Sequence, residues 1–229
     1  MAMKEKLIKH LRQFVTDRRV ELFNRKLASR TRYITVILED IFQPHNASAV
    51  LRSCECFGIQ DVHIIENRNQ YRINPDITLG SNKWLNLHRY NEQPNNTLAA
   101  LNQLKQQGYR IVATAPHHND CLLEEFDLTR GKFALLFGSE LEGLSAAAMD
   151  AADEFIRIPM AGFTESLNIS VSAAICIHHL TLILRQSCID WHLTTDEQQS
   201  IMLEWLKNTV RKSDLIEKSF ENNREGFQE

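Results

Sequence analysis

Apolar residues along this chain alternate between short β-branched runs and longer helical repeats. The short runs predict strands at residues 33–38, 61–65, 110–114, 133–137 and 154–158. Helical spacing occupies residues 46–57, 97–107, 145–152 and 171–184, with Gly58 and Gly108 as stop signals and Ser145 as an N-cap. Short apolar strands separated by helices are typical of parallel sheets. We therefore predict an α/β fold whose mostly parallel sheet is covered by helices on both faces.

Both ends of the chain are predicted to be helical. Helical spacing joins Leu7, Ile8, Leu11, Phe14 and Val15, and a second amphipathic helix follows Asp17. The tail from residue 195 has its buried side at Ile201, Trp205 and Val210. We divide the chain into a helical extension (1–32), an α/β domain (33–188) and a second helical extension (189–229). Within the domain, residues 66–92 are expected to form a long irregular connection, and loops of that length usually carry function.

Composition places the chain among soluble, cytoplasmic proteins. Its 229 residues are 43% hydrophobic and 24% charged, which suits one α/β domain with extensions. No apolar run approaches the roughly 18 residues of a membrane span, and no signal peptide opens the chain. The five cysteines are scattered and are interpreted as reduced thiols. The adjacent pairs His117-His118 and His178-His179 would point apart on a helix or strand, so we predict no metal site.

Charge is distributed unevenly although the net charge is only −3. Residues 1–33 hold ten Lys or Arg against three acidic residues, whereas residues 190–229 hold five against nine. The basic residues either form a solvated helix face or grip phosphates, and charge alone does not decide between the two. The candidate phosphate contacts are Arg12, Arg18, Arg19 and Arg25.

The glycines exclude several nucleotide-binding and hydrolytic classes. No G-x-G occurs, so the dinucleotide-binding fingerprint is absent. Gly138 and Gly143 have the separation of a phosphate-binding loop, but Leu144-Ser145 follows where that loop requires Lys. The G-x-S-x-G pattern of serine hydrolases is also missing.

Three segments combine glycine or proline with small polar residues, and each follows a predicted strand. They are residues 44–52, 136–145 and 158–172. Such composition is typical of loops whose backbone amides and short side chains face a ligand. Three segments of this kind at strand ends indicate a binding site.

These segments resemble the three motifs of the SpoU/TrmH family of RNA 2′-O-ribose methyltransferases, in the SPOUT superfamily. The resemblance rests on order and spacing: Asn46-x5-Arg52, then Phe137-Gly138-Ser139-Glu140-x2-Gly143, then Ile158-Pro159-Met160 followed by Ser166-Leu167-Asn168-x-Ser170. It covers roughly residues 30–185. The short basic N-terminus resembles the members that act on tRNA, which methylate guanosine 18 of the D-loop.

The resemblance implies a deep trefoil knot near the C-terminal end of the domain, whose bends form the S-adenosylmethionine pocket. Carried over, the cofactor contacts are Thr114, Gly138, Ile158 and Leu167. Pro159 would fix a turn, and Gly162 would permit a positive φ. Ile158 and Leu167 would fit an ordinary core almost as well.

The resemblance also implies the groups that carry the chemistry: Arg52, Asn46, Glu140, Ser166 and Asn168. Asn46 and Arg52 diverge by roughly 120° on a helix, so Asn46 would brace a loop while Arg52 reaches the substrate. A guanidinium is a poor base, and we interpret Arg52 as a clamp on a phosphate that also stabilises the developing alkoxide. Glu140 would orient Arg52 or Asn46, and Ser166 and Asn168 would position substrate and loop.

The family further implies a homodimer through the knot region, in which one active site borrows from the neighbouring subunit. The helix 169–184 is apolar nearly all round, so we expect it to be buried on both sides. Two alternatives remain open. The chain could methylate ribosomal RNA or another tRNA nucleotide, or it could be a non-catalytic RNA-binding module of the same fold.

Overall fold

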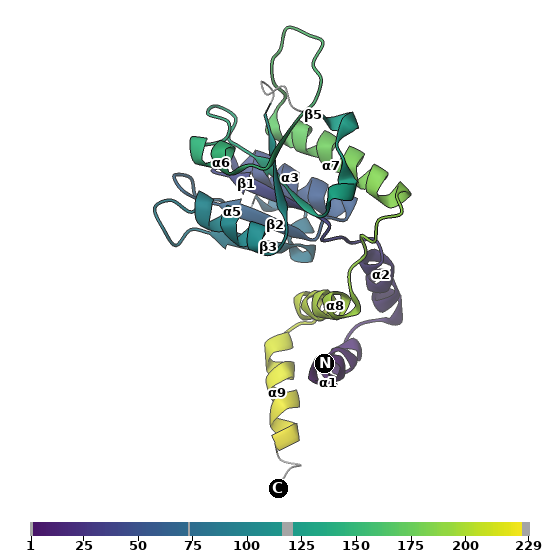
Figure 1. The fold of residues 1–229 in the computed structure, drawn as a ribbon. Coiled ribbons are helices and arrows are strands. Elements are labelled where there is room, and N and C mark those ends of the chain that lie inside the picture. The colour runs from purple at the N-terminus through teal and green to yellow at the C-terminus, as the bar shows by residue number, and fades with distance from the viewer. Residues whose placement is uncertain (1, 73, 116–120, 226–229) are drawn as a thin grey trace. The chain divides into compact units, whose positions relative to one another are not determined.

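The structure is a computed structural model that describes residues 2–72, 74–115 and 121–225. The chain forms two compact units, residues 31–191 and residues 1–30 together with 192–229. Figure 1 shows the sheet and its helices in the first unit and four helices in the second. Each unit has its own buried core.

A parallel sheet forms the centre of the first unit. The order within the described residues is β3-β2-β1-β6-β4-β7-β5, and every neighbouring pair is parallel. The strands are β1 (Ile34–Glu39), β2 (Asp61–Ile65), β3 (Asn86–Tyr90), β4 (Arg110–Thr114), β5 (Cys121–Leu122), β6 (Phe133–Phe137) and β7 (Glu154–Arg157). The predicted parallel α/β fold is confirmed, and the five predicted strands are all present.

Helices cover both faces of this sheet, as predicted. They are α3 (Pro44–Phe57), α4 (Pro75–Thr78), α5 (Thr97–Gln106), α6 (Ala146–Ala151) and α7 (Ile169–Gln186), with short 3-10 turns η1 (Ser81–Trp84), η2 (Leu123–Glu125) and η3 (Leu128–Arg130). Helices α3 and α7 pack together against one face, where Val36 and Leu38 are buried (Figure 1). Helices α5 and α6 cover the other face, where Ile37 is buried. Strand β1, inside the sheet, is therefore buried at every position.

Local signals in the sequence place several of these helix ends correctly. Gly58 ends α3 in the left-handed region at φ 83°, which glycine adopts without steric cost. The Ser145 side chain caps α6 by accepting from Ala148 N. The prediction for residues 66–92 was wrong in part, because this connection contains β3. Strand β3 lies at an edge and is mostly polar, so it lacks the apolar run of a buried strand.

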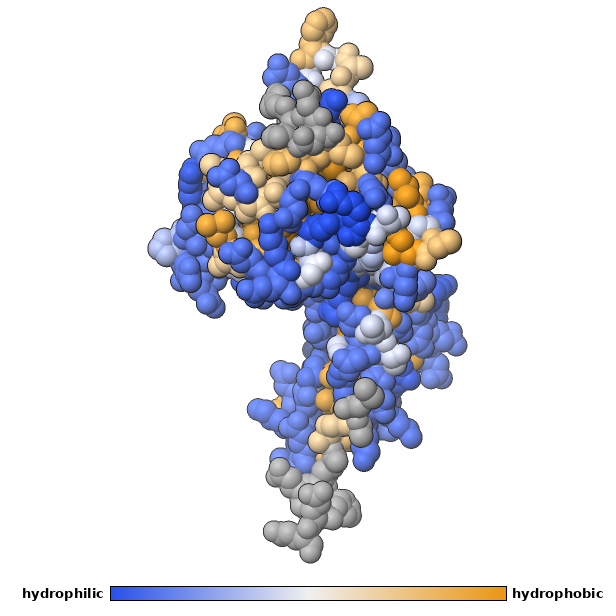
Figure 2. Space-filling view, viewed as in Figure 1, coloured by the Kyte–Doolittle hydropathy of each residue, from blue (hydrophilic) through white to orange (hydrophobic). Residues whose placement is uncertain are grey.

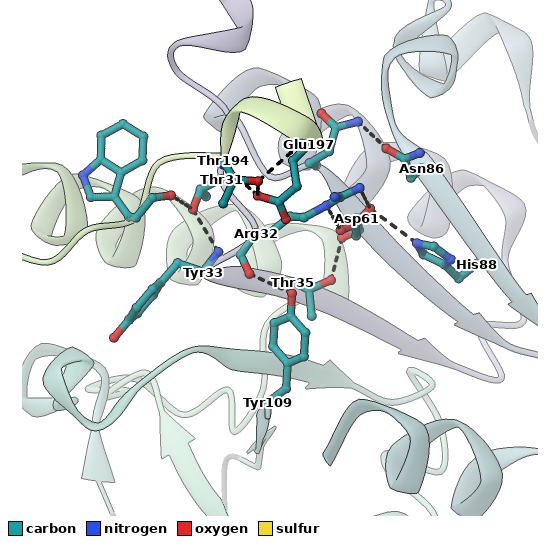
Figure 3. A network of polar contacts seen from close by, with 12 residues as sticks. Thr31, Arg32, Tyr33, Thr35, Asp61, Asn86, His88, Tyr109, Thr194 and Glu197 are labelled. Atoms are coloured by element: carbon teal, nitrogen blue, oxygen red, sulfur yellow. Dashed lines mark hydrogen bonds and ion pairs between the residues drawn. The ribbon is translucent and has the colours of Figure 1, made fainter. Parts of the chain in front are cut away.

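A polar network fastens the amino ends of β1 and β2 (Figure 3). Arg32 Nε donates to Asp61 Oδ2 at 2.7 Å, and His88 Nε2 lies 3.3 Å from Asp61 Oδ1. Burial alone would raise the pKa of Asp61, but the hydrogen bond from His88 and the charge of Arg32 outweigh it, so this pKa lies below its usual range. Tyr109 Oη donates to the main-chain oxygen of Arg32 at 2.7 Å. The network holds the sheet at the edge opposite to the carboxyl ends of the strands.

The second unit consists of α1 (Ala2–Arg12), α2 (Asp17–Leu27), α8 (Thr195–Thr209) and α9 (Ser213–Glu225). Its core contains the predicted Ile201, Trp205 and Val210, and the Phe23 ring meets the Trp205 ring edge-on at 5.5 Å. Phe14 is exposed and lies beyond α1, so the helical spacing predicted through Phe14 and Val15 ends at Arg12 instead.

Helix α7 differs from the sequence prediction in two respects. By length and composition it is apolar enough to span a membrane, although the core helix of a soluble protein passes the same test. Burial on both sides was also wrong for the single chain. Val171, Ile175 and Leu182 are 44%, 38% and 45% exposed, whereas Ala173, Ile177 and Leu180 are fully buried. One stripe of α7 is therefore exposed and largely apolar, with the exposed His178 between Ile175 and Leu182.

Candidate active site

A cavity of about 360 Å³ lies at the carboxyl ends of β4, β6 and β7. Thr114 and Phe137 end the first two strands and line it, and Ile158 follows the third. The remaining walls are the loop 138–144, part of the loop between β7 and α7, and the first turns of α7. Ligands bind at this edge of open parallel sheets because the loops that follow the strands meet there.

The loop 138–144 is a tight turn built on two glycines. Ser139 N donates to the Gly143 oxygen at 2.9 Å, and Gly143 N donates back to the Ser139 oxygen at 3.1 Å. A Cβ on Gly138 would lie 2.2 Å from the Gly143 carbonyl, so only glycine fits there. Gly143 adopts φ 69°. The expected positive φ at Gly162 was wrong, since Gly162 is not among the glycines with that conformation.

Three polar side chains from the three sequence motifs meet beside the cavity. Glu140 Oε1 accepts from Asn46 Nδ2 at 2.5 Å and from Asn168 Nδ2 at 2.8 Å, and Asn168 Nδ2 also lies 3.3 Å from Asn46 Oδ1. Asn46 is buried in the first turn of α3, and Asn168 caps α7 by accepting from Ser170 N. The Glu140 carboxylate therefore joins both helix ends to the cavity wall. Glu140 was predicted to orient either Arg52 or Asn46, and the structure shows its hydrogen bond with Asn46.

The predicted site residues fall into three groups in the structure. The predicted cofactor contacts all line the cavity: Thr114, Gly138, Ile158 and Leu167. Of the predicted catalytic residues, Glu140 and Ser166 also line it, while Asn46 and Asn168 reach it through Glu140.

Arg52 lies apart from these residues. It is exposed on α3 and does not line the cavity, and no hydrogen bond or ion pair from the described part of the chain reaches its guanidinium. The predicted RNA contacts Arg12, Arg18, Arg19 and Arg25 are exposed on α1 and α2.

The electrostatics of the cavity suit a cationic ligand. Glu140, Glu142 and Glu165 line it, together with the guanidinium of Arg157, and Glu142 is paired with Arg68 at 2.7 Å. Apolar side chains from β6, β7 and α7 form its inner wall. Its volume falls in the range of about 300–1,000 Å³ that holds cofactor-sized molecules. Carboxylates around an apolar pocket fit the sulfonium and adenosine of S-adenosylmethionine.

The α7 wall was missed by sequence reasoning. Ser172 and Cys176 line the cavity, and their four-residue spacing, which puts them on one face of α7, was the available signal. Burial raises the pKa of Cys176 to about 12. This thiol therefore stays protonated at neutral pH and is a wall group rather than a nucleophile.

Within residues 2–72, 74–115 and 121–225, no three His, Cys, Asp or Glu side chains gather as a metal site. His178 is exposed on α7, and His179 is half-buried beside it. His117 and His118, which were predicted not to form a metal site, lie outside the described residues.

The loop between β7 and α7 projects from the sheet unit (Figure 1) and carries apolar surface at its tip (Figure 2). The Phe163 side chain is fully exposed, and Met160 is partly exposed while lining the cavity. An apolar loop tip beside a cavity is typical of a surface that another molecule covers.

Comparison with known proteins agrees with this geometry. Residues 33–178 match the SpoU rRNA Methylase family. The chain is 43% identical over 207 residues to the tRNA (guanosine(18)-2′-O)-methyltransferase of Borreliella burgdorferi, covering 90% of this chain and 93% of that protein.

Solved structures give the same result. The A. aeolicus TrmH/SpoU tRNA modifying enzyme superposes with a TM-score of 0.76 at 28% identity, covering 86% of this chain and 98% of that one. The SpoU methyltransferase AviRb of Streptomyces viridochromogenes, solved in complex with AdoMet, shares the fold with a TM-score of 0.57 at 24% identity over 71% of this chain and 62% of that one. The cavity, the three joined motifs and these matches together show that this chain belongs to the SpoU rRNA methylase family.

Proposed function

We propose that this protein transfers the methyl group of S-adenosylmethionine to the ribose 2′-hydroxyl of guanosine 18 in the D-loop of tRNA. The observation that carries the proposal is the hydrogen-bonded set Asn46, Glu140 and Asn168, which brings three distant motifs to the wall of one cavity. The 43% identity to a tRNA (guanosine(18)-2′-O)-methyltransferase over nearly the whole chain supports the substrate. A tRNA substrate and free cysteines support a cytoplasmic location, which cell fractionation tests.

In this proposal the cofactor supplies an activated methyl group, and the protein supplies position and charge. The cofactor would be held at the carboxyl edge of the sheet by the backbone of the loop 138–144 and by the side chains of Ile158 and Leu167. Thr114 would form the cavity wall at the end of β4. Glu140, fixed by two amide donors, keeps the loop in place. The exposed Ser166 hydroxyl then faces the ribose. Alignment of this kind lowers a reaction barrier by several kcal/mol.

Arg52 is assigned to the RNA rather than to the cofactor. Its side chain is exposed and outside the cavity, so it is available to pair with a phosphate in a bidentate manner. A guanidinium close to the reacting ribose would also stabilise the alkoxide that forms as the hydroxyl loses its proton.

The proposal is tested by methylation of defined RNA. Purified protein is incubated with isotope-labelled S-adenosylmethionine and unmodified tRNA, and the product is digested and mapped by mass spectrometry. We expect one methyl group on the ribose of guanosine 18. A tRNA with 2′-deoxyguanosine at that position is the matched control and should accept none. Methylation of another nucleotide, or of ribosomal RNA fragments only, would replace the assigned substrate, and cofactor binding without any transfer would contradict the enzymatic function.

We also propose the trefoil knot and the homodimer that the family implies. Strand β7 lies between β4 and β5, and the chain then leads through the cavity loop into α7, which suits a threaded segment. The exposed apolar stripe Val171, Ile175 and Leu182 on α7 supports a contact between two copies, because these positions share one helix face. An experimental structure traced through residues 154–186 tests the knot.

A charged substitution in the exposed stripe of α7 should dissociate the dimer. Leu182→Glu places a charge within the proposed contact, and we expect sedimentation to show a monomer. Leu215→Glu, the same change at an exposed leucine of α9, is the matched control and should leave the mass unchanged. A Leu182→Glu protein that sediments as wild type would exclude this helix from the interface.

We propose further that the basic extension, residues 1–32, grips tRNA phosphates, while the domain of residues 33–188 carries out the methyl transfer. Reversing Arg18, Arg19 and Arg25 to Glu should weaken tRNA binding. It should also reduce the steepness with which the logarithm of the association constant falls with the logarithm of the salt concentration, by about 1 for each arginine. The triple change to Lys keeps the charge and should keep most of the slope. Filter binding over a salt series measures both proteins, and an unchanged slope in the Glu variant would show that these residues are only solvated surface.

A further inference from the structure

Glu39 is a buried carboxylate for which the function proposed above gives no role. It ends β1, which lies between β2 and β6, and is only 2% exposed. Three donors surround it: Ser145 N at 2.9 Å, Ser145 Oγ at 2.7 Å and Thr97 Oγ1 at 2.6 Å. A buried carboxylate is costly unless hydrogen bonds satisfy its oxygens, so these donors hold it in one position.

The position of Ser145 connects Glu39 to the cavity. Ser145 directly follows the loop 138–144 and begins α6 as its N-cap. The upstream end of the loop is fixed by β6, which pairs with β1 and β4. Its downstream end is fixed by the two bonds from Ser145 to Glu39. Because the turn between these ends is closed by backbone bonds and admits no Cβ at Gly138, a shift at Ser145 moves the loop as one body.

Glu39 is held in turn by a chain of side chains that does not touch the cavity. Thr97 Oγ1, which donates to Glu39, accepts from Asn67 Nδ2 at 2.9 Å. Asn67 Oδ1 accepts from Asn96 N at 2.7 Å, and Asn67 N donates to Asp40 Oδ1 at 3.0 Å. The Glu39 carboxylate therefore has hydrogen-bond partners both at α5, through Thr97, and at the end of the loop 138–144, through Ser145.

We propose that Glu39 is a positioning residue that sets the loop 138–144 at the spacing needed to bind S-adenosylmethionine. The inference rests on the proposed function for the identity of the ligand. Glu39 acts through Ser145 and does not touch the ligand, since it is absent from the residues that line the cavity.

Glu39→Gln tests this role with little change in volume. The amide keeps one acceptor for Ser145 N but turns a donor toward two hydroxyl groups that now donate to the carboxylate. We expect the dissociation constant for S-adenosylmethionine, measured by calorimetry without RNA, to rise by about 10-fold as the loop shifts. The KM for S-adenosylmethionine should rise in parallel, whereas the KM for tRNA should not.

Glu66→Gln is the matched control. Glu66 is also a buried carboxylate at the end of a strand, β2, and it accepts from Tyr71 N and Arg89 rather than from the cavity loop. This variant should lower the melting temperature without changing cofactor affinity. A folded Glu39→Gln protein that binds S-adenosylmethionine as tightly as wild type overturns the inference, and so does an equal loss of affinity in both variants. Wild-type protein that binds no S-adenosylmethionine would instead contradict the proposed function.

Discussion

Arg52→Ala should abolish methyl transfer, with a loss of at least about 1,000-fold in single-turnover rate, while the protein folds and binds S-adenosylmethionine as before. The loss is large because one guanidinium is assigned both to the phosphate clamp and to stabilisation of the alkoxide, and removal of one such donor typically costs about 100- to 1,000-fold. The fold should be spared because the Arg52 side chain is exposed and makes no hydrogen bond to the described residues.

Arg52→Lys separates charge from geometry. Lysine keeps the positive charge but loses the planar pair of donors, so we expect an intermediate rate. Calorimetry with S-adenosylmethionine and a thermal melt accompany each rate measurement. An Arg52→Ala protein that turns over like wild type would remove this residue from the chemistry.

A mixture of two impaired variants shows which subunit uses Arg52. Arg52→Ala and Asn168→Ala are mixed under conditions that exchange subunits. Arg52 does not line the cavity of its own chain, so we expect it to act at the cavity of the second copy. In that case each mixed dimer contains one complete site, and part of the activity returns. If Arg52 serves its own chain, neither site in the mixed dimer is complete and no activity returns.

Much of the sheet unit could be predicted because its signals are local. The strands β2, β4 and β6 are short apolar runs, and Gly58 and Ser145 mark helix ends through their own backbone and side-chain chemistry. The order of the strands could not be predicted in this way. It depends on pairing between distant segments, such as β6 between β1 and β4, and no local pattern specifies a long-range register.

The same difference between local and long-range signals applies to the candidate site. The motifs identified Glu140, Asn46 and Asn168, but the carboxylate that joins both amides became visible only in three dimensions. Glu39 directly follows the predicted strand 33–38, where a single acidic residue carries no sequence signal, and its partners lie 58 and 106 positions away. Apolar composition around α7 predicted burial, but it cannot distinguish a face covered by the core from one left for a second copy.

Asn168→Ala should lower the single-turnover rate by roughly 10- to 1,000-fold at saturating S-adenosylmethionine, because a contact of a few kcal/mol that holds the cavity wall is lost. The Asn168 side chain makes two kinds of contact in the structure. Its Nδ2 donates to Glu140, and its Oδ1 accepts from Ser170 N and Ser170 Oγ at the start of α7. The alanine variant removes both, so it should also lose about 1 kcal/mol of helix-cap stability.

Asn168→Ser distinguishes these two effects, since serine is a good N-cap but cannot donate to Glu140 as the amide does. We expect both variants to lose activity, and only Asn168→Ala to melt lower, by about 2–4 °C for a chain of this size. A serine variant with normal activity would assign the whole effect to the cap. Activity lost only in step with unfolding would remove Asn168 from the active site, because positioning of Glu140 by the amide requires a rate defect in protein that is still folded.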